Sequence, residues 1–582
     1  MQKAQNAMAN VGLHDPLLPV ANDRHAPWLR RKLASHLCRF QESMQELCPK
    51  KMIVLVLIFG CGTGIVAWIY NTFFEVIVHV AWDKLPERLI RPTLLHLSKK
   101  VSWFPAVNRI AWVYTVVLST CFGFLAGMTQ RILGSPGDLP DTVRDIHEKG
   151  YISISKAPSM FLCSTFSIAA GGSLGPEAPL LALCGASCSW FGRRVLLYKG
   201  QRLRNCALLG MTAGLAAFFG VALGGSLFAL EVLHRSGMQF YEVATYAVAT
   251  GALCLVVFRA LSGLPFGAIW EFTQAAPHFH VDFRHILLGA AVGLIAAAFA
   301  MLFMAIHRVL GKVVSSLGLH EHHTPVRSGA LGGLVIGVIG VLLPPVMFWG
   351  EFEIGTLAAP SSALPHIWPK GGVWGLEPFQ QGHYTPVLLL VIAVVKLITV
   401  SVTVLSGFRG GFIFPLFLAG TSLGLAITHV PNVPFLQGLP DVMVAMTMAA
   451  GLNTAITRTP FATSLILTAL SGHPEVAVPC LASSLVALFL TLPFPFILSQ
   501  RDRRDITIKD LELDAEATGQ TVHIDQGTFS GRVQEVADES DSYVVSDSHV
   551  HNWVISGQLT NGNGHVEAPA TPDQLGVVIG GV

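Results

Sequence analysis

Glu177, a single carboxylate inside a long apolar stretch, is the residue of this chain most suggestive of chemistry. It lies in the motif Gly-Ser-Leu-Gly-Pro-Glu-Ala-Pro, residues 172–179, which runs directly into an apolar segment. A carboxylate within membrane-length apolar sequence is costly and by default marks an ion path or a proton relay. The Gly and Pro residues interrupt a helix, so we expect Glu177 just ahead of a helix N-terminus, where backbone N–H groups attract anions. The alternative is a loop glutamate that only caps an ordinary helix.

A second motif of the same design lies in the other half of the chain. Residues 410–415, Gly-Gly-Phe-Ile-Phe-Pro, again place a glycine, three residues and a proline before an apolar segment. Gly175 and Gly411 are 236 positions apart, and Ala-Gly-Leu triplets at 213–215 and 450–452 keep nearly the same spacing. The matched pairs indicate an internal duplication. Broken helices at corresponding places in two halves point to a transporter or channel site near the bilayer midplane.

Composition places the chain among polytopic membrane proteins. It is 52% hydrophobic and 13% charged, with a mean hydropathy of +0.55, which excludes a soluble enzyme. A net charge of +2 is too small to indicate a nucleic-acid partner. Long apolar runs lie at about 52–70, 110–129, 205–233, 241–258, 286–306, 329–348, 387–405 and 411–428. Shorter runs, which need tilted or half-length helices, lie at about 160–171, 179–192, 442–456, 461–471 and 476–498.

The sequence divides into three parts. We expect a cytoplasmic segment at 1–51, a transmembrane domain at 52–500 with related halves at about 52–310 and 327–500, and a polar, mostly disordered tail at 501–582. Basic residues abut both ends of the membrane region, so we expect an integral multi-pass protein with both termini in the cytoplasm. The membrane is that of the cell surface or of an organelle.

Metal and cofactor chemistry is not indicated. The only dense histidine cluster, residues 320–323, lies in a short polar linker without a cysteine partner. We interpret it as a solvated loop and expect no metal and no cofactor.

Three motifs, in this order, resemble the CLC family of chloride channels and chloride/proton exchangers. Residues 174–179 resemble its gating-glutamate motif, Gly-Arg/Lys-Glu-Gly-Pro, residues 213–231 match most closely, and residues 410–415 resemble its Gly-x-Phe-x-Pro signature. The likeness runs from about residue 52 to 499. It implies an all-α polytopic membrane protein with a CLC-like inverted-topology repeat of tilted and broken helices. It also implies a homodimer with one pore per subunit. We expect a eukaryotic-type member without CBS domains, because the tail lacks their alternating strands and helices.

The resemblance implies that Glu177 is the gating carboxylate. Gly137 stands where the family has its central serine, and Phe494 aligns best with its central tyrosine. Because a hydroxyl donor contributes about 1 kcal/mol, the loss of both hydroxyls predicts poor discrimination among similar anions. The implied anion-binding positions are Gly137, Gly175, Pro176, Ala178, Gly411, Phe412, Ile413 and Phe494.

The resemblance also bears on proton coupling. Val232 occupies the family's proton-transfer position, where exchangers commonly have glutamate and channels commonly have valine. Glu231, one residue earlier, points about 100° away on a helix, and we expect it to serve helix packing or the dimer interface. The prediction is a voltage- and pH-gated chloride channel, with a chloride/proton antiporter of the same family as the alternative.

Two other classes are less favoured. A secondary transporter of an organic anion needs additional polar residues around a larger cavity. An intramembrane enzyme needs a catalytic set within the spans, such as paired aspartates or a serine with a histidine. The apolar segments contain no such set, so we expect no enzyme activity.

Overall fold

The chain forms a bundle of helices that run at many inclinations. The computed structural model describes residues 49–100, 110–235, 237–238, 240, 243–270, 272, 281–319, 323–358, 366–375, 377–379, 384–431, 439–501, 532–535, 542–546 and 552–556. Seven helical segments in these ranges are long and apolar enough to cross a membrane: Lys51–His96, Trp112–Leu133, Ala244–Ser262, Phe283–Ser316, Pro325–Leu342, Pro386–Leu405 and Pro474–Thr491. The histidine cluster at 320–323 lies almost entirely outside the described residues.

In the described residues, the first half of the membrane region contains nine α-helices. They are α3 (Pro49–His79), α4 (Arg91–Lys100), α6 (Trp112–Leu133), α7 (Leu139–Lys149), α8 (Ala157–Ala169), α9 (Glu177–Arg194), α10 (Gly200–Phe219), α11 (Ala222–Glu231) and α12 (Ala244–Ser262). Two π-helical turns, Val80–Lys84 and Pro86–Ile90, join α3 to α4.

The second half repeats this succession of long and short helices. It comprises α13 (Phe283–Ser316), α14 (Pro325–Leu342), α15 (Glu351–Ala358), α16 (Pro386–Leu405), α17 (Ile413–Thr428), α18 (Asp441–Thr457), α19 (Pro460–Ser471) and α20 (Ala477–Thr491). Short 3-10 turns lie at Ile154–Lys156, Pro344–Val346, Glu377–Phe379 and Pro474–Val476.

The two halves share one pattern of contacts. Three contacting helix pairs of the first half have a matching pair in the second half. The pair α3 and α12 matches α13 and α20, the pair α9 and α10 matches α17 and α18, and the pair α10 and α12 matches α18 and α20. Two further pairs, α6 with α14 and α11 with α19, each join a helix of the first half to its counterpart in the second half. An internal twofold relation produces both kinds of pairing, which agrees with the duplication inferred from the motifs.

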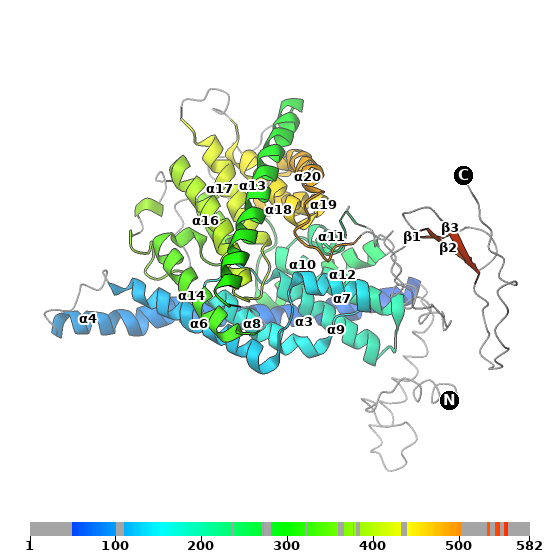
Figure 1. The fold of residues 1–582 in the computed structure, drawn as a ribbon, viewed down its shortest axis with the longest axis horizontal. Helices are drawn as coiled ribbons and strands as arrows, with labels where there is room; N and C mark the ends of the chain where they lie inside the picture. Colours follow the sequence, from blue (N-terminus) through cyan, green and yellow to red (C-terminus); the bar gives the residue numbers. More distant parts are fainter. Residues whose placement is uncertain are drawn as a thin grey trace, which may run out of the picture.

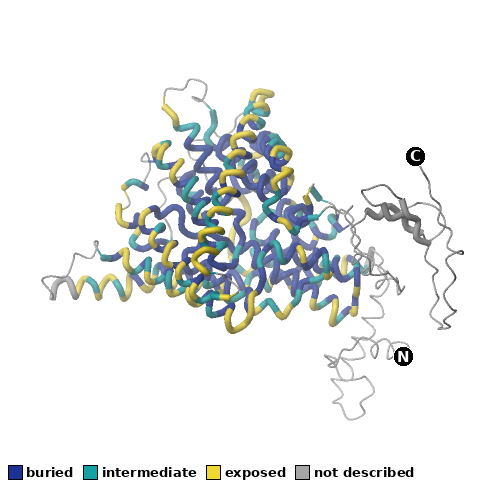
Figure 2. Tube along the Cα trace, in the orientation of Figure 1, coloured by how far each residue is buried: buried dark blue, intermediate teal, exposed yellow. Residues whose placement is uncertain are grey.

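Figures 1 and 2 show how the halves come together. Most helices of the first half, blue to green-cyan, occupy the lower part of Figure 1, and most of the second half, yellow to orange, the upper part. Figure 2 shows the buried residues along the interior, with exposed residues on the outer helices. The motifs at 172–179 and 410–415 lead into α9 and α17, two helices whose residues are mostly buried.

One expected span is broken. The apolar run at 205–233 forms two helices, α10 and α11, which separate at Gly220. Gly220 ends α10 in the left-handed region with φ of 69°, which glycine adopts at little cost. A side chain there would also collide with the Arg259 guanidinium. The apolar pattern correctly predicted that residues 205–233 are largely buried, but it did not show the break between α10 and α11.

Small residues allow the two counterpart helices α6 and α14 to cross closely. A Cβ added at Gly123 or Gly127 of α6 would collide with the backbone of α14, and one at Gly329 or Gly333 would collide with α6. Close approach of backbones through glycines is a common packing mode of membrane helices.

The tail lies mostly outside the described residues. Within it, β1 (Arg532–Glu535), β2 (Ser542–Ser546) and β3 (Asn552–Ser556) form an antiparallel sheet in the order β1-β2-β3. Val533 pairs with Val545, and Val544 pairs with Val554.

Candidate functional site

Gly175 and Gly411, the matched glycines of the two motifs, lie face to face. The N–H of each donates to the carbonyl of the other, with both N···O distances 2.7 Å, in an antiparallel bridge. The two motifs therefore run in opposite directions across a shared point. This bridge brings the N-termini of α9 and α17 together in the interior of the bundle.

Glu177 lies at this junction. It is the first residue of α9, it follows the N-cap Pro176, and Pro179 occupies the first turn, as expected. Its side chain is fully buried, and its Oε1 accepts a hydrogen bond of 2.9 Å from the backbone N–H of Ile413, the first residue of α17. Oε2 is buried and has no hydrogen bond in the described part of the chain.

The carboxylate thus occupies the N-terminus of the partner helix. Two helix N-termini present unpaired N–H groups and positive dipole ends to one small volume. The backbone N–H groups of Glu177 and Phe414 also lie close enough to act on the carboxylate electrostatically. A small anion in the same volume would be stabilised by the same groups, so Glu177 is positioned to compete with a diffusible anion.

The glycines of the two motifs are required by this geometry. A Cβ on Gly175 would collide with Oε2 of Glu177, and a Cβ on Gly411 would collide with its Cγ. Ala178 and Phe412, the other expected anion-site residues here, are buried, and Phe412 is the N-cap of α17. The structure therefore places Gly175, Gly411 and Ile413 against the Glu177 side chain.

Gly137 lies before α7 in a conformation that a serine would adopt only with strain. Its φ is 84°, and it precedes the N-cap Asp138, whose side chain forms a capping box with Asp141. A hydroxyl is nevertheless present, since Oγ of Ser135 accepts a hydrogen bond of 3.4 Å from the Gly137 N–H.

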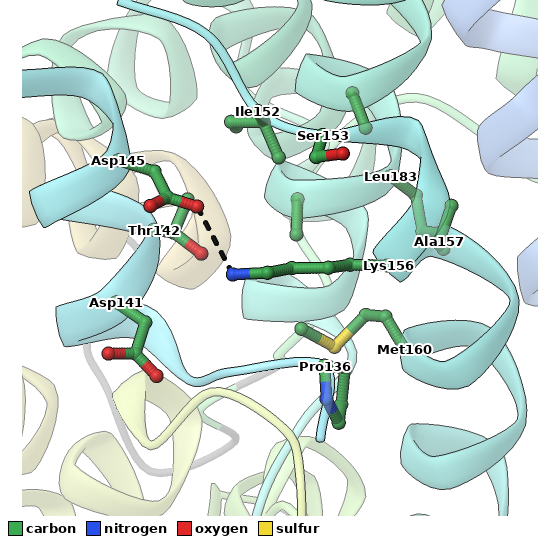
Figure 3. Close-up of a pocket in the computed structure, with 12 residues that line it drawn as sticks. Pro136, Asp141, Thr142, Asp145, Ile152, Ser153, Lys156, Ala157, Met160 and Leu183 are labelled. Carbon is green, nitrogen blue, oxygen red and sulfur yellow. Dashed lines mark hydrogen bonds and ion pairs between the residues drawn. The ribbon is translucent and has the colours of Figure 1, made fainter. Parts of the chain in front are cut away.

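A small pocket flanks the loop that carries Gly137 (Figure 3). Pro136 forms one part of its wall, and the Lys156 side chain extends across it toward α7. Nζ of Lys156 lies 3.2 Å from Asp145, whose other carboxylate oxygen lies 2.7 Å from Lys149. The Asp145 carboxylate therefore pairs with two lysines, one of which, Lys156, lines the pocket.

Phe494 is not where the alignment leads one to expect it. The residue is 53% exposed, whereas a residue closing the inner end of an anion site would be buried. The neighbouring Phe496 instead packs edge-on against Phe412, with ring centroids 5.7 Å apart. The Phe494 ring is therefore exposed, whereas the Phe496 ring contacts Phe412, the N-cap residue of α17.

Glu231 binds the counterpart of its own helix. It is the last residue of α11, and its Oε2 accepts a hydrogen bond of 3.0 Å from the Ala462 N–H in the first turn of α19. This hydrogen bond joins α11 to α19, which is the kind of helix-packing contact expected for Glu231. Val232 is fully buried, and its carbonyl accepts a hydrogen bond of 2.8 Å from Gln500.

Several polar residues near the site were missed from the sequence. The Tyr70 hydroxyl donates to Ser164 at 2.8 Å and lies within electrostatic range of Glu177. Glu351, at the start of α15, accepts a hydrogen bond of 2.9 Å from Trp349 and also lies within that range. Glu177 was singled out because it is a carboxylate that follows an apolar run with Gly and Pro residues at its end. Glu351 follows a similar run, residues 344–350, so the same signal could have identified it.

Lys396 is a further intramembrane charge that the apolar pattern concealed. It lies in α16, is fully buried, and donates from Nζ to the carbonyls of Val346, Met347 and Phe348 at 3.0, 3.3 and 2.7 Å. These bonds attach α16 to the turn after α14.

Comparisons with known proteins agree with this architecture. The model of the voltage gated chloride channel family matches residues 121–492. The chain is 26% identical over 402 residues to a chloride/fluoride channel protein of Pseudomonas syringae pv. tomato, covering 68% of this chain and 80% of that protein. It is 22% identical over 476 residues to the chloride channel protein CLC-e of Arabidopsis thaliana, covering 78% of this chain and 60% of that protein.

Solved structures share the fold. A CLC-type fluoride/proton antiporter is 21% identical with a TM-score of 0.58, over 78% of this chain and all of that one. A slow cyanobacterial Cl⁻/H⁺ antiporter is 17% identical with a TM-score of 0.60, over 81% of this chain and 99% of that one.

Proposed function

Because this chain belongs to the voltage gated chloride channel family, we propose that it is a chloride channel gated by voltage and pH through Glu177. The observation that carries the proposal is the Glu177 carboxylate, which is bonded to the N-terminus of α17 at the point where the two motifs meet. Chloride is the proposed ion, with other small anions as further candidates, fluoride among them because a similar bacterial protein is named for it.

In the proposed gate, Glu177 acts as a tethered anion. When it is ionised, it holds the Ile413 N–H and keeps a mobile anion out. When it is protonated, its attraction to the two helix N-termini weakens and the carboxyl leaves the path. Voltage and pH act through the same step, because a proton or an anion must cross part of the membrane field to reach this buried position.

Proton coupling separates the channel from the antiporter. Val232 has no titratable group, and the Glu231 carboxylate is hydrogen-bonded to the N-terminus of α19. Neither residue is therefore placed to carry a proton, which favours a passive channel. The antiporter remains the second candidate because both structures compared above are antiporters with the same fold.

A paired flux assay tests the proposal. Purified protein in liposomes is given a chloride gradient, and chloride and proton movement are recorded together. A channel collapses the chloride gradient without moving protons uphill. Proton transport against its gradient in a fixed ratio to chloride identifies an antiporter, and the absence of anion flux with chloride, bromide, nitrate and fluoride contradicts both.

The proposal includes the state of the protein in the membrane. It is an integral multi-pass protein, and the basic residues that flank the membrane region, Lys51 and Arg501 among them, support cytoplasmic termini at the cell surface or in an organelle. We expect a homodimer, no bound cofactor or metal, and no enzyme activity. Crosslinking in native membranes tests the dimer.

A further inference from the structure

The link between α14 and α15 packs beside the junction of the two motifs. The N–H of Phe348 in this link donates to the carbonyl of Gly171, the residue directly before the first motif, at 3.0 Å. On the other side, a Cβ added at Gly350 would lie 3.4 Å from the carbonyl oxygen of Phe414, in the first turn of α17. The link therefore contacts both of the elements that meet at the glycine bridge.

Glu351 follows this link as the first residue of α15. Its carboxylate accepts a hydrogen bond of 2.9 Å from the Trp349 indole, and its carbonyl accepts one of 2.9 Å from the Trp270 indole. The Trp270 ring lies edge-on against the Phe414 ring, with centroids 6.1 Å apart. These contacts fix Glu351 beside the first turn of α17.

The same turn holds Glu177. Its carboxylate is bonded to the N–H of Ile413, the residue before Phe414, so both glutamates lie beside one helix N-terminus. Glu177 is fully buried, whereas Glu351 is partly exposed. The two carboxylates act on each other electrostatically. A charge near the surface is thus placed to act on the buried one.

Charged and titratable side chains of several elements act electrostatically on Glu177, on Glu351 or on Glu353, two residues further along α15. They include Tyr70 and Glu75 of α3, Arg259 of α12, His366, and Lys396 of α16.

These neighbours modify the field of the cluster without replacing Glu351. Lys396 opposes the charge of Glu353, which lies on the same helix as Glu351. The Glu75 carboxylate accepts a hydrogen bond of 2.7 Å from Asn71. Arg259 opposes the charge of Glu351, and all variants of the test retain it. A change at Glu351 alone therefore reports the action of that one charge.

We infer that Glu351 is a positioning residue of the gate, whose negative charge disfavours the ionised, closed form of Glu177. This inference rests on the proposed gating by Glu177. Like charges disfavour each other's ionisation, and they interact strongly where little water separates them. An ionised Glu351 therefore favours protonation of Glu177, and this effect falls away when protons from solution neutralise Glu351. The two carboxylates titrate as a coupled pair, over a wider pH range than a single group.

The test compares the wild type with Glu351→Gln, Glu351→Asp and the control Glu377→Gln. The first variant removes the charge, and the second keeps a carboxylate that is one methylene shorter. Glu377 is an exposed glutamate in the connection between α15 and α16. Anion current through the full-length protein in planar bilayers is recorded at fixed voltage over a range of pH, which is varied on one side at a time.

Glu351→Gln should move the pH of half-maximal current to a more acidic value by about 0.5 pH unit or more, because Glu177 then stays ionised to lower pH. The curve should also become steeper, since one group titrates instead of a pair. Glu351→Asp should stay close to the wild type, and Glu377→Gln should not differ from it. An unchanged midpoint in Glu351→Gln, or an alkaline shift, would overturn the inference. Equal shifts in both Glu351 variants would also overturn it, since the charge would then not be responsible.

The same substitution in a Glu177→Gln background tests whether Glu351 acts through Glu177. Glu351→Gln should add no pH-dependent change there, because the group on which it acts no longer titrates. A pH-dependent change that persists in the double variant would overturn the inference. If the Glu351 variants do not fold, as judged by size-exclusion chromatography, the wild-type curve decides: a coupled pair gives a curve broader than a one-proton titration, and a one-proton curve would overturn the inference.

Failure of the proposed function gives a different result. A wild-type protein that carries no anion current, or a current that does not depend on pH, contradicts the proposed gating and with it this inference. A pH-dependent current that is lost in Glu177→Gln but unaffected by Glu351→Gln overturns the inference alone.

Discussion

The carboxylate of Glu177 accepts a hydrogen bond of 2.9 Å from Ile413, the residue 236 positions later in the chain. Gly175 and Gly411, which bridge each other, have this same separation. Glu177 and Ile413 are also the first residues of α9 and α17. The two residues therefore hold equivalent positions in the two halves of the chain. Glu177 supplies a carboxylate from the first half, and this carboxylate binds the N-terminus of α17 in the second half.

Neutralising Glu177 is expected to open the path. In Glu177→Gln the charge-assisted hydrogen bond to Ile413 is lost, which costs the closed state about 2 kcal/mol, or about thirtyfold in the closed-to-open ratio. Anion current in voltage clamp should therefore persist at voltages and pH values where the wild type is closed. A variant that closes like the wild type would show that Glu177 is not the gate.

Glu231→Gln is the matched control for that substitution. Glu231 is equally buried and also bonded to a helix N-terminus, that of α19. We expect this variant to keep wild-type dependence on voltage and pH. Its thermal stability in detergent should fall, because the charged hydrogen bond to Ala462 contributes about 1 to 2 kcal/mol. Altered gating in this variant would mean that loss of any buried carboxylate disturbs the path.

Gly411→Ala is expected to displace the gate. The added Cβ would collide with Glu177, and overpacking of this kind costs about 1 to 3 kcal/mol. Thermal unfolding should show the loss of stability, and voltage clamp should show weakened closure. Gly62→Ala in α3 serves as the control, because its added Cβ meets nothing within 4 Å. The prediction is wrong if the two alanine variants have the same stability.

Gly137→Ser tests whether the family's serine fits this loop. With φ of 84°, a residue with a side chain is strained by about 1 to 2 kcal/mol. We expect a lower unfolding temperature and no gain in chloride selectivity, because the strain displaces the loop. Reversal potentials in mixed chloride and nitrate that show sharper selectivity at unchanged stability would contradict this expectation.

A pH-dependent contact lies beyond the end of α17. Nε2 of His429 lies 3.4 Å from the Asp441 carboxylate, and this hydrogen bond raises the pKa of His429. Since the folded pKa is raised, the contact stabilises fully below about pH 6.5, and its contribution is lost as the pH rises through the folded pKa. His429→Gln should therefore lower stability by about 0.5 kcal/mol at pH 6 and leave it unchanged at pH 9. Equal effects at both pH values would contradict a charged histidine.

The sequence alone determined the local design of the site. The motif around Glu177 predicts a helix N-terminus beside this residue, and Glu177 is the first residue of α9. The second motif predicts a matching helix, and α17 begins at Ile413. These expectations hold because glycine, proline and a run of apolar residues constrain the backbone within a few positions.

Tertiary structure decided which residues meet. The Ile413 bond to Glu177, the Ala462 bond to Glu231 and the Ser135 bond to Arg409 each join residues more than 200 positions apart. Nothing in the local sequence specifies such a partner, because it depends on how the two halves pack against each other. The same reason explains Phe494 and Phe496: they differ by two positions, and only the path of the chain after α20 determines which ring faces Phe412.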